Sequence, residues 1–159
     1  MFLESFDSNS KPLQHKGNLI IKGDITPGAE IVATGDITIL GFIESSFVKC
    51  GGDLFVANGI IGEKIDENNS KITCIVKCGG SLYTNFIQYS TIYIGQDLNI
   101  KRQLLHSNIS CGGYVTVQDH TEKRGAIFGG VLNAIKGVRT VNLGATSGVK
   151  TIVNLAGSY

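Results

Sequence analysis

The sequence has no tryptophan and only two prolines, and its charges nearly cancel to a formal net charge of +1. Such a chain has no long-range field that would draw it onto nucleic acid, an anionic membrane or acidic substrates. It also lacks any apolar run near the roughly 20 residues that a membrane-spanning helix needs. Residues 1–16 lack the charged start and apolar core of a secretory signal. We therefore expect a cytoplasmic protein with no membrane span and no nucleic-acid partner.

Glycine, by contrast, is abundant, with 21 glycines among 159 residues. Glycine adopts the positive φ of tight turns without steric cost, so this composition is typical of many short strands separated by turns. The chain is long enough to bury a core as one domain without metal or disulfides. We predict an all-β protein.

A repeat of about 17 residues organises these strands. An apolar-x-apolar strand follows each glycine turn, as Ile37 and Ile39 follow Gly35. A further coil begins at Gln96, and the long interval before Gly80 indicates one coil plus a loop insertion near residues 66–76. The predicted turn glycines are Gly17, Gly35, Gly52, Gly80, Gly113 and Gly130.

A second apolar pair precedes each turn and alternates with polar residues, which predicts one inward and one outward face per strand. In the last coil we assign Ala126 and Phe128 to this pair, and Leu132 and Ala134 to the strand after the turn. The predicted inward column before the turns is Ala33, Cys50, Cys78, Ile94, Cys111 and Phe128.

Together these patterns predict a single-stranded right-handed parallel β-helix, a solenoid of about seven coils, over residues 17–159. Residues 1–16 are expected to form a polar segment or cap. Right-handed winding is favoured because crossovers between parallel strands prefer it, and because no strict six-residue pattern is present. Strand edges exposed at the ends of such a helix could pair with another copy, so a homo-oligomer is one expectation.

The cysteines admit two interpretations. Cys50, Cys78 and Cys111, with Cys74, could be the thiolate ligands of a metal site. The three column cysteines, however, occupy the position where other coils have Ala33 or Ile94. We therefore expect buried free thiols and no metal.

The acidic and imidazole groups also admit a catalytic interpretation. Stacked Asp36 and Asp53, with Asp97 further along, could approach the roughly 5 Å separation of a retaining glycosidase pair. Other coils carry Asn18 or Ser81 there, which favours a role in forming the turn. His106 lies beside a serine, but no orienting acid is identifiable, so a corner histidine is expected. We predict no catalytic residues and no cofactor.

One group of cations is a candidate interaction site. Lys101, Arg102, Lys123 and Arg124 would form a basic spot if neighbouring corners bring them together, and His106 is grouped with them. Such a spot would suit an acidic protein partner, although four cations on two turns are also typical of a solvated surface.

Several segments carry a resemblance to a known family. They are Gly23 to Ala29, the Cys-Gly-Gly turns followed by Leu105 to Gly113, and Arg124 to Gly130 with the closing Leu143 to Thr151. In this order they resemble the β-helical region of the flagellar assembly protein A family. The early coils are similar to the C-terminal β-helix of the division inhibitor that partners the Min ATPase, and bactofilins share the architecture.

The resemblance implies a right-handed β-helix with a role in bacterial flagellar or cell-pole organisation, and it implies no catalytic residue. We expect a non-catalytic protein-interaction scaffold with an unidentified protein partner. The alternative is a self-assembling structural β-helix of the bactofilin type, and a more distant one is an enzyme acting on polysaccharide.

Overall fold

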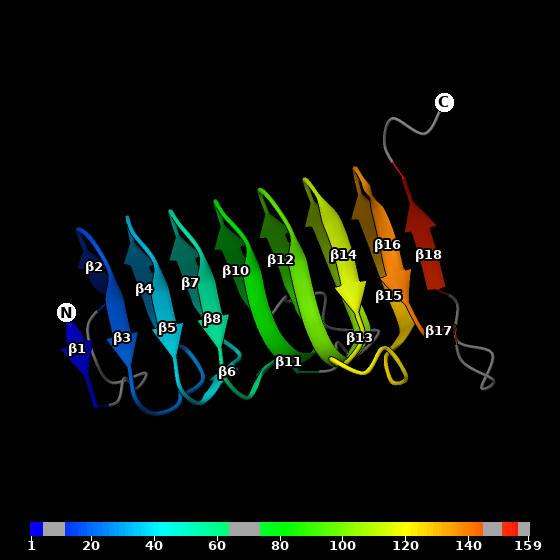
Figure 1. Cartoon of the computed structure of the whole chain (residues 1–159). Helices are drawn as coiled ribbons and strands as arrows, with labels where there is room; N and C mark the ends of the chain where they lie inside the picture. The colour runs from blue at the N-terminus through cyan, green and yellow to red at the C-terminus, as the bar shows by residue number, and fades with distance from the viewer. Residues whose placement is uncertain (5–11, 64–73, 145–150, 156–159) are drawn as a thin grey trace, which may run out of the picture.

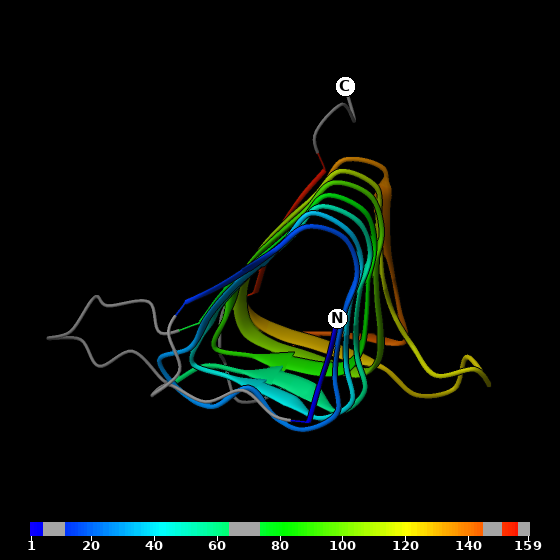
Figure 2. The same cartoon turned by 90° about the vertical axis from the view of Figure 1, so that its left-hand side faces the viewer.

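The chain is a three-sided solenoid of parallel strands. The computed structural model describes residues 1–4, 12–63, 74–144 and 151–155, and within these ranges the regular elements are all strands. Every pairing between them is parallel, and each strand pairs with its counterpart in the next coil. Figure 2 shows the triangular outline of the stacked coils in a view along their axis. The predicted all-β solenoid fold is confirmed.

The first side of the triangle carries the strands that follow the glycine turns. Alternate residues of these strands point into the core, as Leu19 and Ile21 do. The strands are β1 (Phe2–Leu3), β3 (Leu19–Ile21), β5 (Ile37–Ile39), β8 (Leu54–Val56), the start of β11 (Leu82–Gln88), the start of β13 (Leu98–Cys111), β14 (Tyr114–Val117) and β16 (Gly137–Thr140).

The third side carries the strands that precede those turns. Figure 1 shows β3, β5 and β8 running down the near side and β4, β7 and β10 running up the far side as the chain advances, which is a right-handed winding. The strands of the third side are β2 (Leu13–His15), β4 (Glu30–Ala33), β7 (Phe47–Cys50), β10 (Ile75–Cys78), β12 (Thr91–Ile94), the end of β13, the end of β15 (Ala126–Ala134) and β18 (Thr151–Asn154).

The second side was not anticipated from the sequence. Its strands are β6 (Phe42–Glu44), β9 (Gly59–Ile61), the end of β11, the middle of β13, the start of β15 and β17 (Asn142–Leu143). Each of these strands except β17 contributes a single inward residue to the core, and Ile25 extends that column through an isolated bridge to Ile43. The column of these residues, all at most 2% exposed, is Ile25, Ile43, Ile60, Ile87, Leu104 and Ile127.

The assignment of the last coil was wrong. Phe128 lies on the second side beside Leu105, and the residue that continues the inward column after Cys111 is Ala134. Gly130 pairs with Ser107 at the beginning of the third side, where its φ is +78°, whereas the turn that stacks on Gly113 is at Lys136. The cause is a loop over residues 118–124. It inserts extra residues before β15, so the later positions of this coil come several residues further along the sequence than the repeat predicts.

Two other predicted boundaries concern the loop insertion near residues 66–76 and the N-terminal segment of residues 1–16. Residues 64–73, which include most of the predicted insertion, lie outside the described residues, whereas Cys74 and Val76 belong to the core. At the start of the chain, β1 pairs with β3 and β2 with β4, so the described part of residues 1–16 extends the stack.

Candidate functional site

Three corners join the sides, and each has its own chemistry. We call them the glycine corner, between the third and first sides, the loop corner, between the first and second, and the left-handed corner, between the second and third. The predicted turn glycines other than Gly130 stack at the glycine corner, where Gly35 N–H donates to Gly17 O and Gly52 N–H to Gly35 O.

The aspartates of the glycine corner are hydrogen-bond acceptors between coils. Asp36 Oδ1 accepts the Asp53 N–H at 2.8 Å, Asp53 Oδ1 accepts the Ser81 N–H at 2.8 Å, and Asp97 Oδ1 accepts the Tyr114 N–H at 2.8 Å. Asn18 and Ser81 accept in the same way from their neighbours. One oxygen of each side chain is thereby committed to the backbone of the next coil, as the turn-forming interpretation requires.

Cys50, Cys78 and Cys111 line the inner side of the same corner, whereas Cys74 lies at the other end of the third side, where its carbonyl accepts the Thr91 N–H. All four are free and buried. Cys50 donates its S–H to Gly35 O at 3.1 Å, and Cys111 donates to Gln96 O at 2.9 Å. A hydrogen bond with Cys50, together with burial, holds the pKa of Cys78 far above the ordinary range of a thiol. Burial likewise raises the pKa values of Cys74 and Cys111, so these thiols are poor nucleophiles.

An open groove runs along the rod outside this corner, with a volume of about 680 Å³. Its floor is bare backbone at Gly51, Gly79, Gly95 and Gly112, which precede the turn residues. A Cβ on Gly95 would collide with the Gly79 carbonyl, and a Cβ on Gly79 would collide with that of Gly51. Close stacking of the coils therefore requires glycine here. We call this feature the glycine groove.

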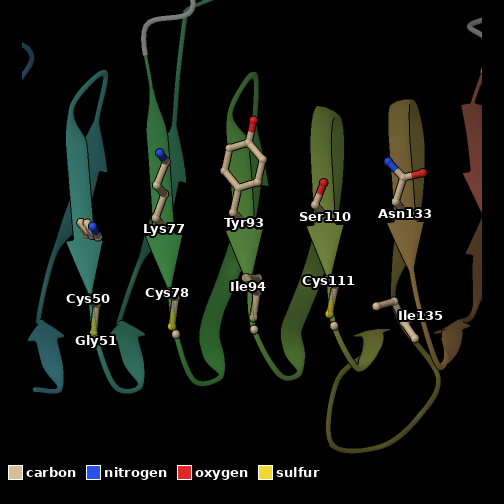
Figure 3. A pocket seen from close by; sticks show the side chains of 14 residues that line it. Cys50, Gly51, Lys77, Cys78, Tyr93, Ile94, Ser110, Cys111, Asn133 and Ile135 are labelled. Carbon is tan, nitrogen blue, oxygen red and sulfur yellow. The ribbon is translucent and has the colours of Figure 1, made fainter. Parts of the chain in front are cut away.

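The outward column of the third side forms the wall of the glycine groove. Figure 3 shows Lys77, Tyr93, Ser110 and Asn133 in one row across successive strands, with Ile135 at one end. Tyr93 is 47% exposed and Ile135 is 57% exposed. The Lys77 ammonium lies 5.7 Å from the centre of the Tyr93 ring, within cation–π range. The groove thus combines apolar surface with a few polar groups, as ligand-binding pockets do.

The loop corner holds the predicted cations. Between Thr84 and Phe86 the pairing of β11 with β13 shifts by one residue, so Lys101 and Arg102 together face Asn85. This irregularity is a β-bulge, which changes the direction in which the neighbouring side chains point. The bulge residues, with Gln103, His120 and Arg124, line a hollow of about 580 Å³ that we call the basic hollow.

The loop over residues 118–124 closes the basic hollow through Asp119. Asp119 Oδ1 accepts hydrogen bonds from Thr121 Oγ1 at 2.8 Å and from the N–H groups of Lys123 and Arg124 at 3.2 and 3.3 Å. The Thr121 hydroxyl and these N–H groups lower the pKa of Asp119. The structure therefore brings Lys101, Arg102 and Arg124 to one hollow, which Lys123 does not line.

His106 lies apart from these cations, at the left-handed corner. It has φ +46° and stacks on Tyr89, with ring centres 5.2 Å apart and planes 10° apart, while Phe128 meets it edge-on. Gly129 continues the corner, because a Cβ there would collide with the His106 ring. His106 therefore packs between coils, separate from the basic hollow.

The sequence interpretation missed the residues that define both sites. It assigned the second glycine of each Cys-Gly-Gly turn a role but not the first, which makes the floor of the glycine groove. The repeated Gly-Gly pair was the available signal. Asn85, Gln103 and His120 carried no signal, because a bulge and a loop bring them together.

The residues that the structure describes contain no helix that could cross a membrane. Within the same ranges, no group of three or more His, Cys, Asp or Glu residues is arranged to hold a metal ion.

Comparison with known proteins gives one match. No curated protein matches the chain, and no solved structure does. The model of the Flagellar Assembly Protein A beta solenoid domain (FapA) matches residues 13–159, which is nearly the whole sequence and includes all three sides of the solenoid. The chain therefore belongs to the flagellar assembly protein A family.

Proposed function

We propose that this chain is a non-catalytic, cytoplasmic protein-interaction scaffold that serves flagellar or cell-pole organisation, as the family name suggests. The observation that supports it best is the glycine groove, an apolar channel along a rigid stack of strands. Solenoids commonly bind partners along such extended surfaces.

The expected occupant is an extended segment of a partner protein. A floor without side chains allows the partner's apolar side chains to approach the backbone closely. The wall supplies an exposed aromatic ring at Tyr93, a residue type enriched among binding hot spots, and a cation at Lys77 that can pair with an acidic group of the partner. The groove crosses successive coils, so it offers contacts at the spacing of about 4.8 Å between parallel strands.

Site-specific photocross-linking in the cells that make the protein tests this proposal. A benzophenone amino acid at Tyr93 should give a cross-link to a discrete partner, and Lys77→Glu should weaken it. The matched control is the same probe at Tyr114, which is 38% exposed but lies outside the groove. Equal adducts from both positions, or none from Tyr93, would overturn the proposal.

Self-assembly of the bactofilin type is the second candidate, and one observation favours it. On the last described strands the inward position is uncovered: Leu143 is 56% exposed, whereas its partner Ile127 is 1% exposed. Sedimentation velocity over a hundredfold concentration range should then show growth into large species, which Leu143→Glu should prevent. A single small species at all concentrations would contradict self-assembly.

A further inference from the structure

The basic hollow continues into an aromatic hollow on the first side. This second hollow, of about 130 Å³, is lined by Phe55 and Tyr83 among others, and it shares Asn85 and Lys101 with the basic hollow. Phe55 and Tyr83 are paired on neighbouring strands, and their side chains are 43% and 44% exposed. Two exposed aromatic rings therefore lie beside a group of cations.

The cations of this surface outnumber its carboxylates, because Asp119 is the one acidic residue among those that line the basic hollow. Lys101, Arg102 and Arg124 form no ion pair with any described carboxylate. Asp119 also lines the hollow, but its Oδ1 is occupied by three donors of its own loop. Glu122 belongs to that loop and does not line the hollow. Three cations against one carboxylate leave a net positive charge, which makes the hollow attractive to an anionic group.

Local geometry explains why the cations converge. The bulge places Lys101 and Arg102 opposite the single residue Asn85 and bends the strand there. In the next coil the loop held by Asp119 brings Arg124 to the same hollow. Two departures from the regular repeat, in adjacent coils, thus supply the positive charge.

We propose that this surface binds an acidic segment of a protein partner that carries an apolar or aromatic side chain beside its acidic residues. The inference rests on the proposed function insofar as the rod binds proteins, but it assigns a site on a different corner from the glycine groove. The carboxylates of the partner pair with Lys101, Arg102 and Arg124, and its apolar side chain packs on Phe55 and Tyr83.

A peptide suits the surface better than a nucleic acid does. Nucleic-acid sites neutralise many successive phosphates and therefore need an extended basic stripe. Here the cations are confined to one hollow, and the whole chain carries a formal net charge of only +1. The neighbouring aromatic hollow is small and fits one side chain.

Fluorescence anisotropy with labelled synthetic peptides and the full chain tests the inference. The probe is a peptide of six glutamates followed by Leu-Phe, at low salt. We expect saturable binding that weakens about tenfold or more when the glutamates are replaced by glutamine. A peptide with Ser-Ser in place of Leu-Phe should bind more weakly, and the difference should vanish in the Tyr83→Ser variant.

Charge-reversal variants assign the site. Arg102→Glu with Arg124→Glu should weaken the probe about tenfold or more. The matched control, Lys16→Glu with Lys136→Glu, changes the net charge equally at exposed positions outside the hollow and should change binding less than about twofold. Circular dichroism establishes that both double variants remain folded.

Three results would overturn the inference: equal weakening by both double variants, equal binding of the glutamine peptide, or tighter binding of a ten-residue oligothymidylate than of the probe. Failure of the proposed function is a separate result. Loss of the Tyr93 cross-link with intact peptide binding removes the groove proposal only, and a persistent cross-link without peptide binding removes only this inference.

Discussion

The hydrogen-bond ladder of the glycine corner predicts the outcome of replacing Asp53. This carboxylate accepts the Ser81 N–H at 2.8 Å, and Ser81 is 6% exposed, so Asp53→Ala leaves a donor without a partner in a poorly hydrated place. An unsatisfied buried donor costs about 1–3 kcal/mol. Because Asp53 itself is exposed, we expect a loss of about 1–2 kcal/mol in the free energy of unfolding. For a chain of this size that lowers Tm by about 2–8 °C.

The chain provides its own controls for this experiment. Asn18 and Ser81 perform the same task in other coils, so Asp53→Asn and Asp53→Ser should retain most of the stability. Glu30→Ala removes an exposed carboxylate of the third side that is not part of the ladder. Urea unfolding followed by far-UV circular dichroism, with refolding curves to establish reversibility, measures each variant. Equal losses for Asp53→Ala and Asp53→Asn would refute the ladder as the cause.

Three further predictions concern the core. Thr84 is 5% exposed and its hydroxyl has no partner, so Thr84→Val should stabilise the fold by about 1 kcal/mol; an unchanged or lower urea midpoint would contradict this. Ile60→Ala on the second side should cost about 2–5 kcal/mol, far more than Ile20→Ala at a 40% exposed position, and similar losses would mean that the second side is not core. Burial raises the pKa of Cys74 above its ordinary value of 9.0, so the stability that this thiol contributes is present below about pH 9 and lost as the pH rises toward the folded-state value. Urea titrations at increasing pH should show this slope and Cys74→Ala should reduce it, while thiol reagents should label the folded chain slowly; fast labelling would contradict burial of the thiols.

The sequence predicts two sides of the solenoid because their strands carry a strong signal. Each has an apolar-x-apolar pair next to a glycine, as Val48 and Cys50 have before Gly51. The second side has only one inward residue per strand, such as Ile43 between Phe42 and Glu44. A single buried residue has no alternation from which to recognise a strand. Its closing corner is also formed without a glycine at Tyr89 and His106, which adopt positive φ.

The last coil shows how a local pattern can mislead. Gly129 and Gly130 repeat the pairs Gly79-Gly80 and Gly112-Gly113, but they lie at the left-handed corner, with φ of +74° and +78°. The same dipeptide therefore serves two corners for different reasons. At the glycine corner the absence of side chains makes room for the neighbouring coil. At the left-handed corner the two glycines adopt the positive φ that the turn needs. Only the strand pairing shows at which of the two corners a given Gly-Gly pair lies.

The in-register stacking of the coils gives the molecule a length that changes in fixed steps. Gly79 and Gly95 occupy the same place in successive coils, and so do Cys78 and Ile94. Excision of residues 79–94 would join Cys78 to Gly95 and bring matching strands into contact on all three sides. The rod would shorten by about 4.8 Å, the spacing of one strand, and its corners would keep their alignment. A chain built in this way can act as a molecular ruler, since gain or loss of whole coils alters the distance between features at its two ends without redesigning either.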